Sequence, residues 1–306
     1  MNSAINIKSL KKKYGEFDAL KGIDLSIPEG SFYGLLGPNG AGKTTTIGII
    51  TGLVKLGTGT VEVMGWDIIE NFRKSRKLIG LASQEYNFDI FFSIEQILKF
   101  QAGYYGLSKM EAQENTEKVL EQFGLAEKRK NKPRELSGGM KRRLQIAKAL
   151  VHDPPILILD EPTAGVDIEL RHMLWDYLKK INSEGKTILL TTHYIEEAEK
   201  LCDHIAIINS GLIIKEDTTD RLLSEMGTHQ IVLKIPNLDE TLLSLDNYEY
   251  IIQNNNLAVQ SAAPEKDLAI LSEKVRDKGY SITEIDIQKS NLEDIFLDLT
   301  KEENNG

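Results

Sequence analysis

The octapeptide GPNGAGKT at residues 37–44 has the residue types and the spacing that bind the phosphates of a nucleotide. Glycine at its turns lets the backbone curl so that N–H groups point inward at an anion. Lys43 supplies a positive charge to the β- and γ-phosphates, and the hydroxyl of Thr44 can ligate Mg²⁺. The residues assigned to nucleotide binding by this loop are Gly37, Pro38, Asn39, Gly40, Ala41, Gly42, Lys43, Thr44 and Thr45.

Two adjacent carboxylates, Asp160 and Glu161, end the short apolar run ILILDEPT. Neighbouring residues of a strand point to opposite faces, so the two carboxylates cannot have the same role. Asp160 can hold Mg²⁺ through water, whereas Glu161 can polarise the water that attacks the γ-phosphate. Alone, the pair could equally be a solvated turn. The phosphate loop in the same chain favours the catalytic interpretation.

A third motif, LSGGM at residues 136–140, predicts a second anion site. Ser137 stands where a helix N-cap would, and Gly138 and Gly139 open the first turn. The helix is expected to run to Asp153 and to stop at the Pro-Pro pair that follows. A lone Ser-Gly-Gly is typical of an ordinary capped helix. The order of phosphate loop, Ser-Gly-Gly helix and acidic strand end favours a functional site.

These motifs need strands that end at the site and helices that begin there. The phosphate loop follows the strand pattern SFYGLLG and precedes the helical pattern of residues 44–53. The runs at 155–162 and 187–193 are typical of strands buried on both faces of a parallel sheet. Residues 94–151 carry three helical patterns and form a helical insert. Residues 4–10, 22–27 and 59–65 predict further strands.

The segment after residue 228 predicts a small α+β domain without a catalytic constellation. Strand patterns are HQIVLKI, YEYIIQ, LAVQS and YSITEIDI, and amphipathic helix patterns are PEKDLAILSEKVRDKG and NLEDIFLDLTKEE. The stretch NLDETLLSLDN between them fits neither pattern clearly.

Bulk composition limits the classes of function. A net charge of −9 argues against a nucleic-acid partner, since phosphate binding usually needs a basic face. The single cysteine, Cys202, excludes an intrachain disulfide and is expected to be an ordinary core residue. The N-terminus resembles no signal peptide, and no apolar run is long enough to cross a bilayer. We therefore expect a soluble or peripheral protein.

The three motifs, in this order and spacing, resemble those of the ATP-binding subunits of ABC transporters, over residues 4–220. The family's usual signature has glutamine where this chain has Met140. The resemblance implies an α/β fold: a P-loop, RecA-like ATPase core with an antiparallel β subdomain and a helical subdomain at about 86–153, in a domain spanning 1–227. A C-terminal accessory α+β domain would occupy 228–306.

The family also explains why one chain has two anion sites. Its ATPases pair head-to-tail, and each ATP lies between one subunit's phosphate loop and the other's signature helix. The resemblance therefore implies a homodimer in which ATP favours the closed pair and hydrolysis favours opening. The implied cofactors are ATP and Mg²⁺.

Further positions take roles from the same resemblance. Tyr14 corresponds to an aromatic that stacks on adenine, and Gln84 to the glutamine that reaches Mg²⁺ and senses the γ-phosphate. Asp167, in AGVD, belongs to the loop that crosses the dimer interface, although serine is commoner than Ala164 there. His193 corresponds to the histidine that contacts the γ-phosphate. The implied catalytic residues are Glu161, His193, Lys43 and Gln84, and the metal ligands are Thr44, Gln84 and Asp160.

Four further sequence segments, together with the C-terminal extension, resemble one branch of the family. This branch is the export-type subunits of the daunorubicin-resistance kind, closest to bacterial YadG-type ATPases. The segments concerned are KFQAGYYGL, LSGGMKRRL, EPTAGVDIELR and TTHYIEEAE, with the C-terminal extension. Such subunits pair with a separate polytopic permease. The implied location is the cytoplasmic face of the inner membrane, held there through the permease, without a nucleic-acid partner.

Aromatic residues are dense between Tyr86 and Tyr105, just after Gln84. The irregular loop YNFDIFF suits a docking groove for a permease helix, so Phe91 or Phe92 is expected to contact the membrane subunit. Phe100 and Tyr104, four apart on one helix face, are expected to belong to the core of the helical insert.

Two other classes of function are considered. A soluble ABC ATPase of translation or DNA maintenance would carry two cassettes or a long coiled coil, and this chain shows one cassette and no sustained heptads. A nucleotide-gated scaffold would bind ATP without turnover, which the intact Lys43, Asp160, Glu161 and His193 argue against.

Overall fold

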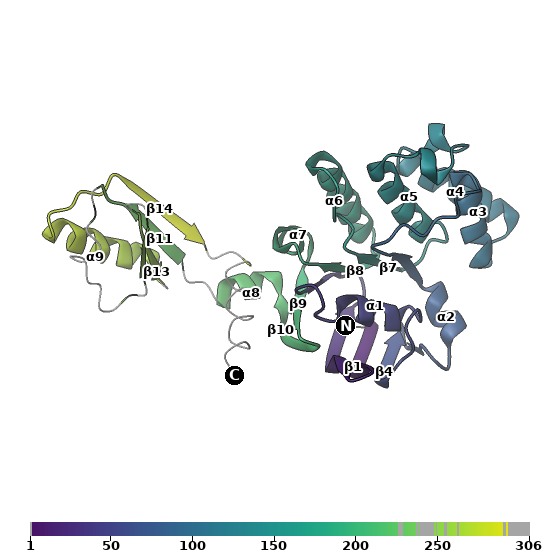
Figure 1. Ribbon diagram of the computed structural model, residues 1–306, viewed down its shortest axis with the longest axis horizontal. Helices are drawn as coiled ribbons and strands as arrows, with labels where there is room; N and C mark the ends of the chain where they lie inside the picture. Colours follow the sequence, from purple (N-terminus) through teal and green to yellow (C-terminus); the bar gives the residue numbers. More distant parts are fainter. Residues whose placement is uncertain are drawn as a thin grey trace. The chain divides into compact units, whose positions relative to one another are not determined.

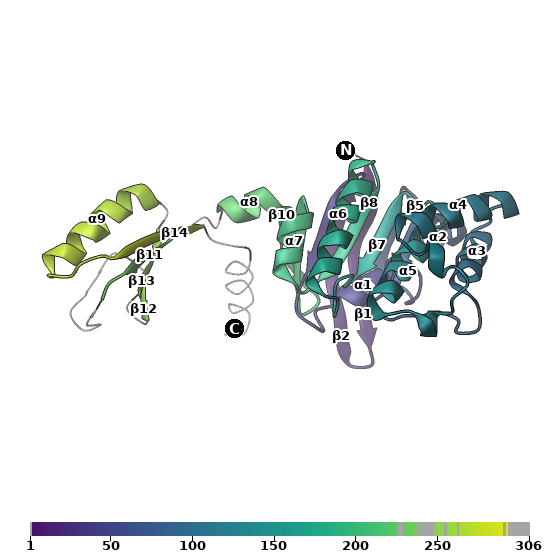
Figure 2. The same cartoon turned by 90° about the horizontal axis from the view of Figure 1, so that it is seen from above.

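The computed structural model describes residues 2–225, 229–236, 238, 248, 250–253, 256–261, 263–289 and 292. It divides the chain into two compact units, Met1–Thr219 and Asp220–Gly306, each with its own hydrophobic core. Figures 1 and 2 label the elements of both units. The sequence-based boundary between 227 and 228 lies outside the described residues and stays a prediction.

A four-stranded antiparallel sheet belongs to the first unit. Its spatial order is β2-β1-β4-β5, and its strands are β1 (Ser3–Tyr14), β2 (Phe17–Pro28), β4 (Thr58–Val63) and β5 (Trp66–Asp67). In β1, Ile5 and Ile7 are buried whereas Asn6 between them is partly exposed. This alternation is typical of an antiparallel sheet with one face on the core.

A six-stranded sheet supplies the strand ends that form the site. Its order is β10-β9-β3-β8-β7-β6, with all pairs parallel except the β9–β10 edge pair. Its strands are β3 (Phe32–Leu36), β6 (Ile79–Ala82), β7 (Ile156–Asp160), β8 (Thr187–Thr192), β9 (His204–Asn209) and β10 (Leu212–Thr218). Every residue of β3, β7 and β8 is buried, as the apolar runs predict. Parallel strands end at one edge, so the segments after β3, β6, β7 and β8 meet there.

One helix joins the two sheets into a single core. The helix α1 (Lys43–Ile50) contributes Ile47, Ile49 and Ile50 to a buried cluster. The same cluster contains residues of β1, β2 and β4 from the antiparallel sheet and of β3, β7, β8 and β9 from the larger one. The phosphate loop and the antiparallel sheet therefore share one packed interior.

Further helices lie between residues 72 and 225 of the chain. They are α2 (Phe72–Lys77), α3 (Ile94–Tyr104), α4 (Lys109–Gln122), η1 (Ala126–Lys128), η2 (Pro133–Glu135), α5 (Gly138–Leu150), α6 (Ile168–Ser183), α7 (Ile195–Leu201) and α8 (Thr219–Glu225). Among them, α3, α4 and α5 correspond to the three helical patterns predicted over residues 94–151. Every further helix except α8, which begins at the last residue of the first unit, belongs to that unit. The helix α5 ends at Leu150 rather than at Asp153, where φ is 51°. Cys202 is buried and free, as expected.

Helices α3, α4 and α5 lie between β6 and β7 in the chain and gather at one end of the first unit in both views (Figures 1 and 2). Ser93 and Ser108 begin α3 and α4 with capping boxes. The sequence-based expectation that Phe100 and Tyr104 belong to the core is wrong, because they are 57% and 88% exposed. The buried face of α3 is formed instead by Ile94, Ile97, Leu98 and Ala102.

The second unit contains a four-stranded antiparallel sheet in the order β12-β13-β11-β14. Its elements are β11 (His229–Lys234), β12 (Tyr250–Gln253), β13 (Asn256–Ser261), α9 (Pro264–Asp277) and β14 (Glu284–Lys289). Leu271 and Val275 of α9 join Ile231, Leu233, Leu257 and Val259 in its core. The predicted helix NLEDIFLDLTKEE and the unclear segment NLDETLLSLDN lie outside the described residues except for Leu292 and Leu238.

In the part of the chain that the structure describes, we find no helix with the length and apolarity required to cross a bilayer.

Candidate active site

The phosphate loop connects the end of β3 to the first turn of α1, and two of its glycines are required by their surroundings. A Cβ on Gly37 would lie 2.3 Å from the carbonyl oxygen of Ile208. At Gly42, φ is +113°, and a Cβ would lie 2.7 Å from Cδ2 of Leu20. Glycine is therefore the residue that allows the loop to pass this close to β2 and β9.

Lys43 is held inside this loop. Its Nζ donates to the carbonyl oxygens of Gly37, at 2.7 Å, and Pro38, at 3.1 Å. The same nitrogen lies 3.7 Å from Oε1 of Glu161. Burial lowers the pKa of Lys43, and the nearby carboxylates of Glu161 and Asp160 partly oppose this effect. The result is a buried amine at the place where the loop would receive phosphates.

Asp160 is buried at the end of β7 between two hydroxyl groups. Thr44 Oγ1 donates to its Oδ2 at 3.3 Å, and Thr191 Oγ1 donates to its Oδ1 at 2.5 Å. Thr191 holds the carboxylate from the neighbouring strand β8, so its orientation is fixed. Thr44 and Asp160 thus present hard oxygen atoms side by side, from α1 and β7.

This oxygen set fits Mg²⁺ better than a transition metal. Among the described residues, no group of three or more His, Cys, Asp or Glu side chains could enclose a metal ion. Mg²⁺ is usually bound by one or two protein oxygens together with substrate phosphates and water. The hydroxyl of Thr44 and the carboxylate of Asp160 satisfy that requirement beside the phosphate loop.

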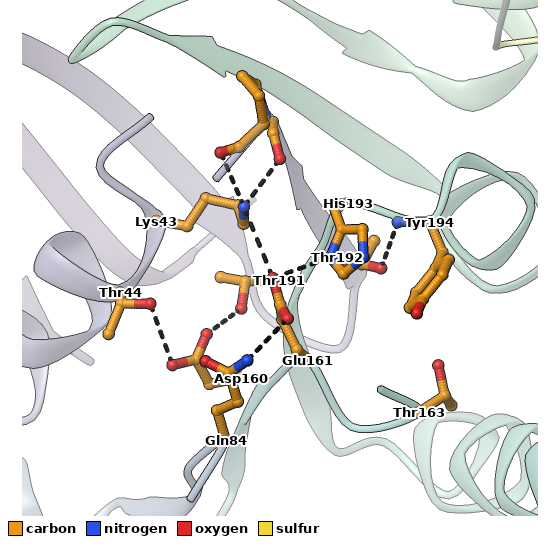
Figure 3. A network of polar contacts seen from close by, with 12 residues as sticks. Lys43, Thr44, Gln84, Asp160, Glu161, Thr163, Thr191, Thr192, His193 and Tyr194 are labelled. Atoms are coloured by element: carbon orange, nitrogen blue, oxygen red, sulfur yellow. Dashed lines mark hydrogen bonds and ion pairs between the residues drawn. The ribbon is translucent and has the colours of Figure 1, made fainter. Parts of the chain in front are cut away.

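The carboxylate of Glu161 is the centre of the site (Figure 3). Its Oε2 accepts from Nε2 of Gln84 at 3.1 Å, and its Oε1 lies 3.0 Å from Nδ1 of His193. The side chain is only 8% exposed. Its backbone has φ of 49°, in the left-handed region. Such a conformation costs about 1–3 kcal/mol outside glycine and is concentrated at functional sites.

His193 follows β8 and is partly exposed. Its ring centroid lies 4.1 Å from that of Tyr194, and the backbone N–H of Tyr194 donates to Thr192 Oγ1 at 2.9 Å. Figure 3 shows His193, Lys43 and Gln84 approaching Glu161 from three different segments. The structure therefore brings together all four residues that the sequence assigns to catalysis.

A hollow of about 440 Å³ extends from this cluster to Tyr14. The ring of Tyr14, at the end of β1, is 48% exposed and has the ammonium of Lys12 5.1 Å from its centroid. The hollow therefore has an aromatic ring at one end, which suits a nucleotide base, and the phosphate loop at the other, which suits the phosphates of the same nucleotide. The hollow is lined by Tyr14, Phe17, Ala19, Asn39, Gly40, Gly42, Lys43, Thr44, Thr45, Gln84 and Glu161.

The signature motif lines a different hollow of about 680 Å³. Ser137 caps α5, as predicted, by accepting from the backbone N–H of Met140 at 3.3 Å. Asp167 caps α6, where its Oδ1 accepts from the N–H of Leu170 at 2.9 Å. The lining residues are Tyr86, Ser137, Gly138, Gly139, Arg143, Gly165, Val166, Asp167, Glu169, Leu170 and Met173. The two hollows share none of these described lining residues.

Several residues of the site have no signal in the sequence. Thr191 orients Asp160, and Phe17 lines the nucleotide hollow. Glu197 is buried in α7, where its Oε1 accepts from Thr163 Oγ1 at 2.8 Å and from Trp175 Nε1 at 3.2 Å. Burial raises the pKa of Glu197. Within the acidic stretch IEEAEK, only the contacts of the folded chain distinguish this buried carboxylate from Glu196, which is exposed, and Glu199, which is partly exposed.

Comparison with known proteins decides the family. A family model described as ABC transporter matches residues 20–164. The Nod factor export ATP-binding protein I of Cupriavidus metallidurans is 37% identical over 99% of both chains. The linearmycin resistance ATP-binding protein LnrL of Bacillus subtilis is 36% identical over 97% of this chain and 98% of the relative. The chain belongs to the ATP-binding subunits of ABC transporters.

Solved structures of ABC cassettes show the same fold. One, described as the ATP-binding subunit of an ABC transporter, aligns with a TM-score of 0.68 at 28% identity, over 73% of this chain and 93% of its own. Another, a dimeric cassette in a post-hydrolysis state bound to ADP and Pi, aligns with a TM-score of 0.65 at 29% identity, over 70% and 98%. As an ABC subunit, the chain binds ATP and hydrolyses it.

Proposed function

We propose that this ABC subunit drives an exporter, and that it hydrolyses ATP as a head-to-tail homodimer. The observation that carries the proposal is the presence of two half-sites in one chain. The hollow that contains Lys43 and Glu161 has the groups for hydrolysis, and the hollow at Ser137 has an anion-binding helix start. In the dimer, each ATP would lie between the Lys43 hollow of one copy and the Ser137 hollow of the other. Two ATP molecules would therefore complete two composite sites.

The catalytic step is assigned to the cluster around Glu161. Its carboxylate acts as the base that orients and polarises the attacking water. Gln84 and His193 hold that carboxylate from either side and contact the γ-phosphate, so the presence of this phosphate alters both contacts. Lys43 provides the positive charge, which the loop carbonyls keep in place before ATP arrives.

Mg²⁺ is assigned to Thr44, Asp160 and the amide oxygen of Gln84. When bound, it would neutralise negative charge that develops on the phosphates. The hydrogen bond between Thr191 and Asp160 keeps the carboxylate directed at this position. The amide nitrogen of Gln84 is engaged by Glu161, which leaves its oxygen for the metal.

Complementation of two inactive variants tests the head-to-tail arrangement. Lys43→Ala weakens phosphate binding, and Ser137→Arg places bulk and charge in the anion site of α5. Neither variant should hydrolyse ATP alone. Mixed in equal amounts, half of the dimers would be heterodimers with one intact composite site. About a quarter of the wild-type activity is therefore the upper limit of recovery, and coupling between the two sites lowers it.

The same experiment distinguishes the alternative in which each site forms within one chain. In that case the mixture would stay as inactive as its components. ATPase activity measured against the mixing ratio, with a maximum near equal amounts, would support the composite site. Activity that stays at the level of the separate variants at every ratio, in a mixture that also forms no ATP-dependent heterodimer on size-exclusion chromatography, contradicts it.

The direction of transport is proposed from the relatives, whose names state Nod factor export and linearmycin resistance. The finer assignment, to the daunorubicin-resistance branch and its YadG-type members, rests on the sequence motifs. A separate polytopic permease would hold the subunit at the cytoplasmic face of the membrane. ATP-dependent uptake of substrate into inverted vesicles containing both subunits would support export, whereas uptake into right-side-out vesicles would indicate import.

The docking surface for that permease is proposed at residues 84–92. Phe91 is 74% exposed, and Phe92 lies edge-on to Phe100 with ring centroids 4.9 Å apart. Exposed aromatic rings of this kind typically supply the buried anchors of an interface. This loop directly follows Gln84. A movement of Gln84 when the γ-phosphate binds or leaves would therefore displace the loop and, through it, the membrane subunit.

A further inference from the structure

Helix α5 has a polar, buried side in addition to its capped start. Arg142 is 2% exposed and Gln145 is 5% exposed, although both side chains are strongly polar. Burying a charged guanidinium is costly unless its donors are satisfied. The contacts that satisfy them therefore indicate what this side of the helix is for.

Arg142 donates to the main chain of two catalytic segments. Its Nε and Nη2 donate to the carbonyl oxygens of Pro162 and Glu161, directly after β7. Its Nη1 donates to the carbonyl oxygens of Ser83, at 3.1 Å, and Gln84, at 3.4 Å, after β6. One planar side chain thus joins the backbone of the proposed base to the backbone of the proposed γ-phosphate sensor.

Gln145, one turn later on the same helix, fixes the orientation of this guanidinium. Its Oε1 accepts from Nη1 of Arg142 at 2.6 Å. Its Nε2 donates to the carbonyl oxygens of Ser83 and Glu85, both at 2.6 Å. The segment around Gln84 is therefore held on both sides by α5.

The start of the same helix lies in the other half-site. Ser137, Gly138 and Gly139 line the second hollow, and Arg142 follows Ser137 by about one and a half helical turns. A helix of this length moves as a rigid element over such a distance. A shift of its N-terminus is therefore transmitted to the groups that Arg142 holds.

We propose that Arg142, oriented by Gln145, is a positioning residue that couples the two ATP sites of the dimer. The inference rests on the composite sites proposed above. ATP bound by the partner's phosphate loop sits on the Ser137 end of α5. Through the contacts of Arg142, the same helix then fixes the position of the main chain at Glu161 and Gln84 in the subunit's own site. Each site is thereby prepared for hydrolysis by occupation of the other.

Replacing Arg142 by lysine tests this role in the full-length chain. Lysine keeps the charge but has three donors on a single nitrogen, so it cannot satisfy the four carbonyl oxygens that the planar guanidinium contacts. A misplaced catalytic group typically costs about 10–100-fold in rate, so kcat should fall by that factor while KM for ATP changes less than about twofold. The Hill coefficient for ATP should fall to near one, because the sites no longer communicate.

Arg129→Lys is the matched control. Arg129 directly follows η1 and donates to Oε1 and Oε2 of Glu117 at 2.8 and 2.6 Å, and it lines neither hollow. This variant should retain the kcat and Hill coefficient of wild type. If Arg142→Lys does not fold, Gln145→Leu carries the test: it removes the orienting contacts, and the Hill coefficient should fall in the same way.

The outcomes separate this inference from the proposed function. A wild-type chain that shows ATP-dependent dimers and cooperative hydrolysis, together with Arg142→Lys and Gln145→Leu chains of unchanged kcat and Hill coefficient, overturns the coupling role alone. A lowered melting temperature with unchanged kinetics overturns it too, in favour of a structural role. Wild-type hydrolysis that is independent of chain concentration and non-cooperative overturns the composite sites and the coupling together.

Discussion

Glu161 combines an unusual backbone with a fully engaged side chain. Its positive φ turns the chain sharply after β7, so that Asp160 faces Thr44 while the next carboxylate faces Lys43, Gln84 and His193. Adjacent carboxylates can then perform different tasks within one short segment. The positive φ of Glu161 costs conformational free energy, and the hydrogen bonds of the Asp160 and Glu161 side chains offset this cost.

Replacing Glu161 by glutamine should separate ATP binding from hydrolysis. The amide resembles the carboxylate in shape but cannot act as a base, so the rate should fall about 10²–10⁴-fold. ATP binding should persist, and the chain should accumulate as an ATP-bound dimer. Size-exclusion chromatography with and without ATP, beside turnover measurements, checks both expectations.

Glu196→Gln is the control for this change, since Glu196 is an exposed acid three residues after His193 in the chain. It should hydrolyse ATP at the wild-type rate and show no trapped dimer. A Glu161→Gln chain that stays monomeric with ATP and turns over normally would remove Glu161 from the catalytic role.

His152 provides a pH-dependent contribution to stability. Its ring stacks on Tyr105 at 3.6 Å and lies 3.1 Å from the carbonyl oxygen of Ile79 through Nε2. Burial lowers its pKa from 6.5 to about 4. The unfolded chain therefore takes up a proton between these values that the folded chain does not, and stability is lost as pH falls through that window.

The free energy of unfolding of wild type should fall by up to about 3 kcal/mol more than that of His152→Gln between pH 6.5 and 4. Glutamine retains a donor for Ile79 but does not titrate. Urea denaturation at a series of pH values measures the difference, because the other titrating groups are common to both chains. Parallel stability curves would contradict this contribution of His152.

At the scale of elements, the sequence predicts the parts of the site that depend on motifs. The strands, the phosphate loop, the Ser137 cap and the acidic end of β7 follow from local patterns, because glycine turns, caps and apolar runs act over a few residues. Arg142 and Thr191 are different. Their roles depend on partners that are far away in the sequence. The residues next to Arg142 have the pattern of an ordinary helix, and those next to Thr191 have the pattern of an ordinary buried strand.

Helix α3 shows why periodicity alone can mislead. Phe100 and Tyr104 have the spacing of a helical face, but so do Ile94, Ile97 and Leu98, and only one face can be buried. The aliphatic face packs inward, and the aromatic face is left exposed, with the ring centroid of Phe100 4.9 Å from that of Phe92. We therefore expect Phe100 to extend the proposed docking surface rather than the core.

Changing both Phe91 and Phe92 to serine should uncouple ATPase from transport. The rings contribute no hydrogen bond to the catalytic cluster, so hydrolysis by the isolated chain should persist. Association with the permease and transport should be lost, because an interface depends on a few buried aromatic anchors. Co-purification of the permease and a transport assay measure the two effects.

Met110→Ser is the matched control, because Met110 is 79% exposed on α4 and lies outside the proposed surface. It should leave permease association unchanged. Undiminished capture of the permease by a folded Phe91→Ser, Phe92→Ser chain would place the docking surface elsewhere.

At the scale of the whole molecule, the first unit consists of two kinds of part. Both sheets and α1 share one continuous core, whereas α3, α4 and α5 form a helical group that inserts between β6 and β7. The hollow for hydrolysis belongs mainly to the first part, and α5 brings the anion site from the second. The contacts of Arg142 join α5 to the segments after β6 and β7, which contribute Gln84 and Glu161 to the hollow for hydrolysis.

The shared core of the two sheets has a consequence for which nucleotides fit. Tyr14 ends a strand of that core, and Gly42 of the phosphate loop packs directly against Leu20 of the neighbouring strand. The spacing between the aromatic ring and the loop is therefore set by packed aliphatic side chains. An adenine stacked on Tyr14, as the sequence predicts, would lie at a set distance from phosphates in the loop. We expect interior residues such as Leu20 and Ile47 to influence which ligand lengths fit, although neither lines the hollow.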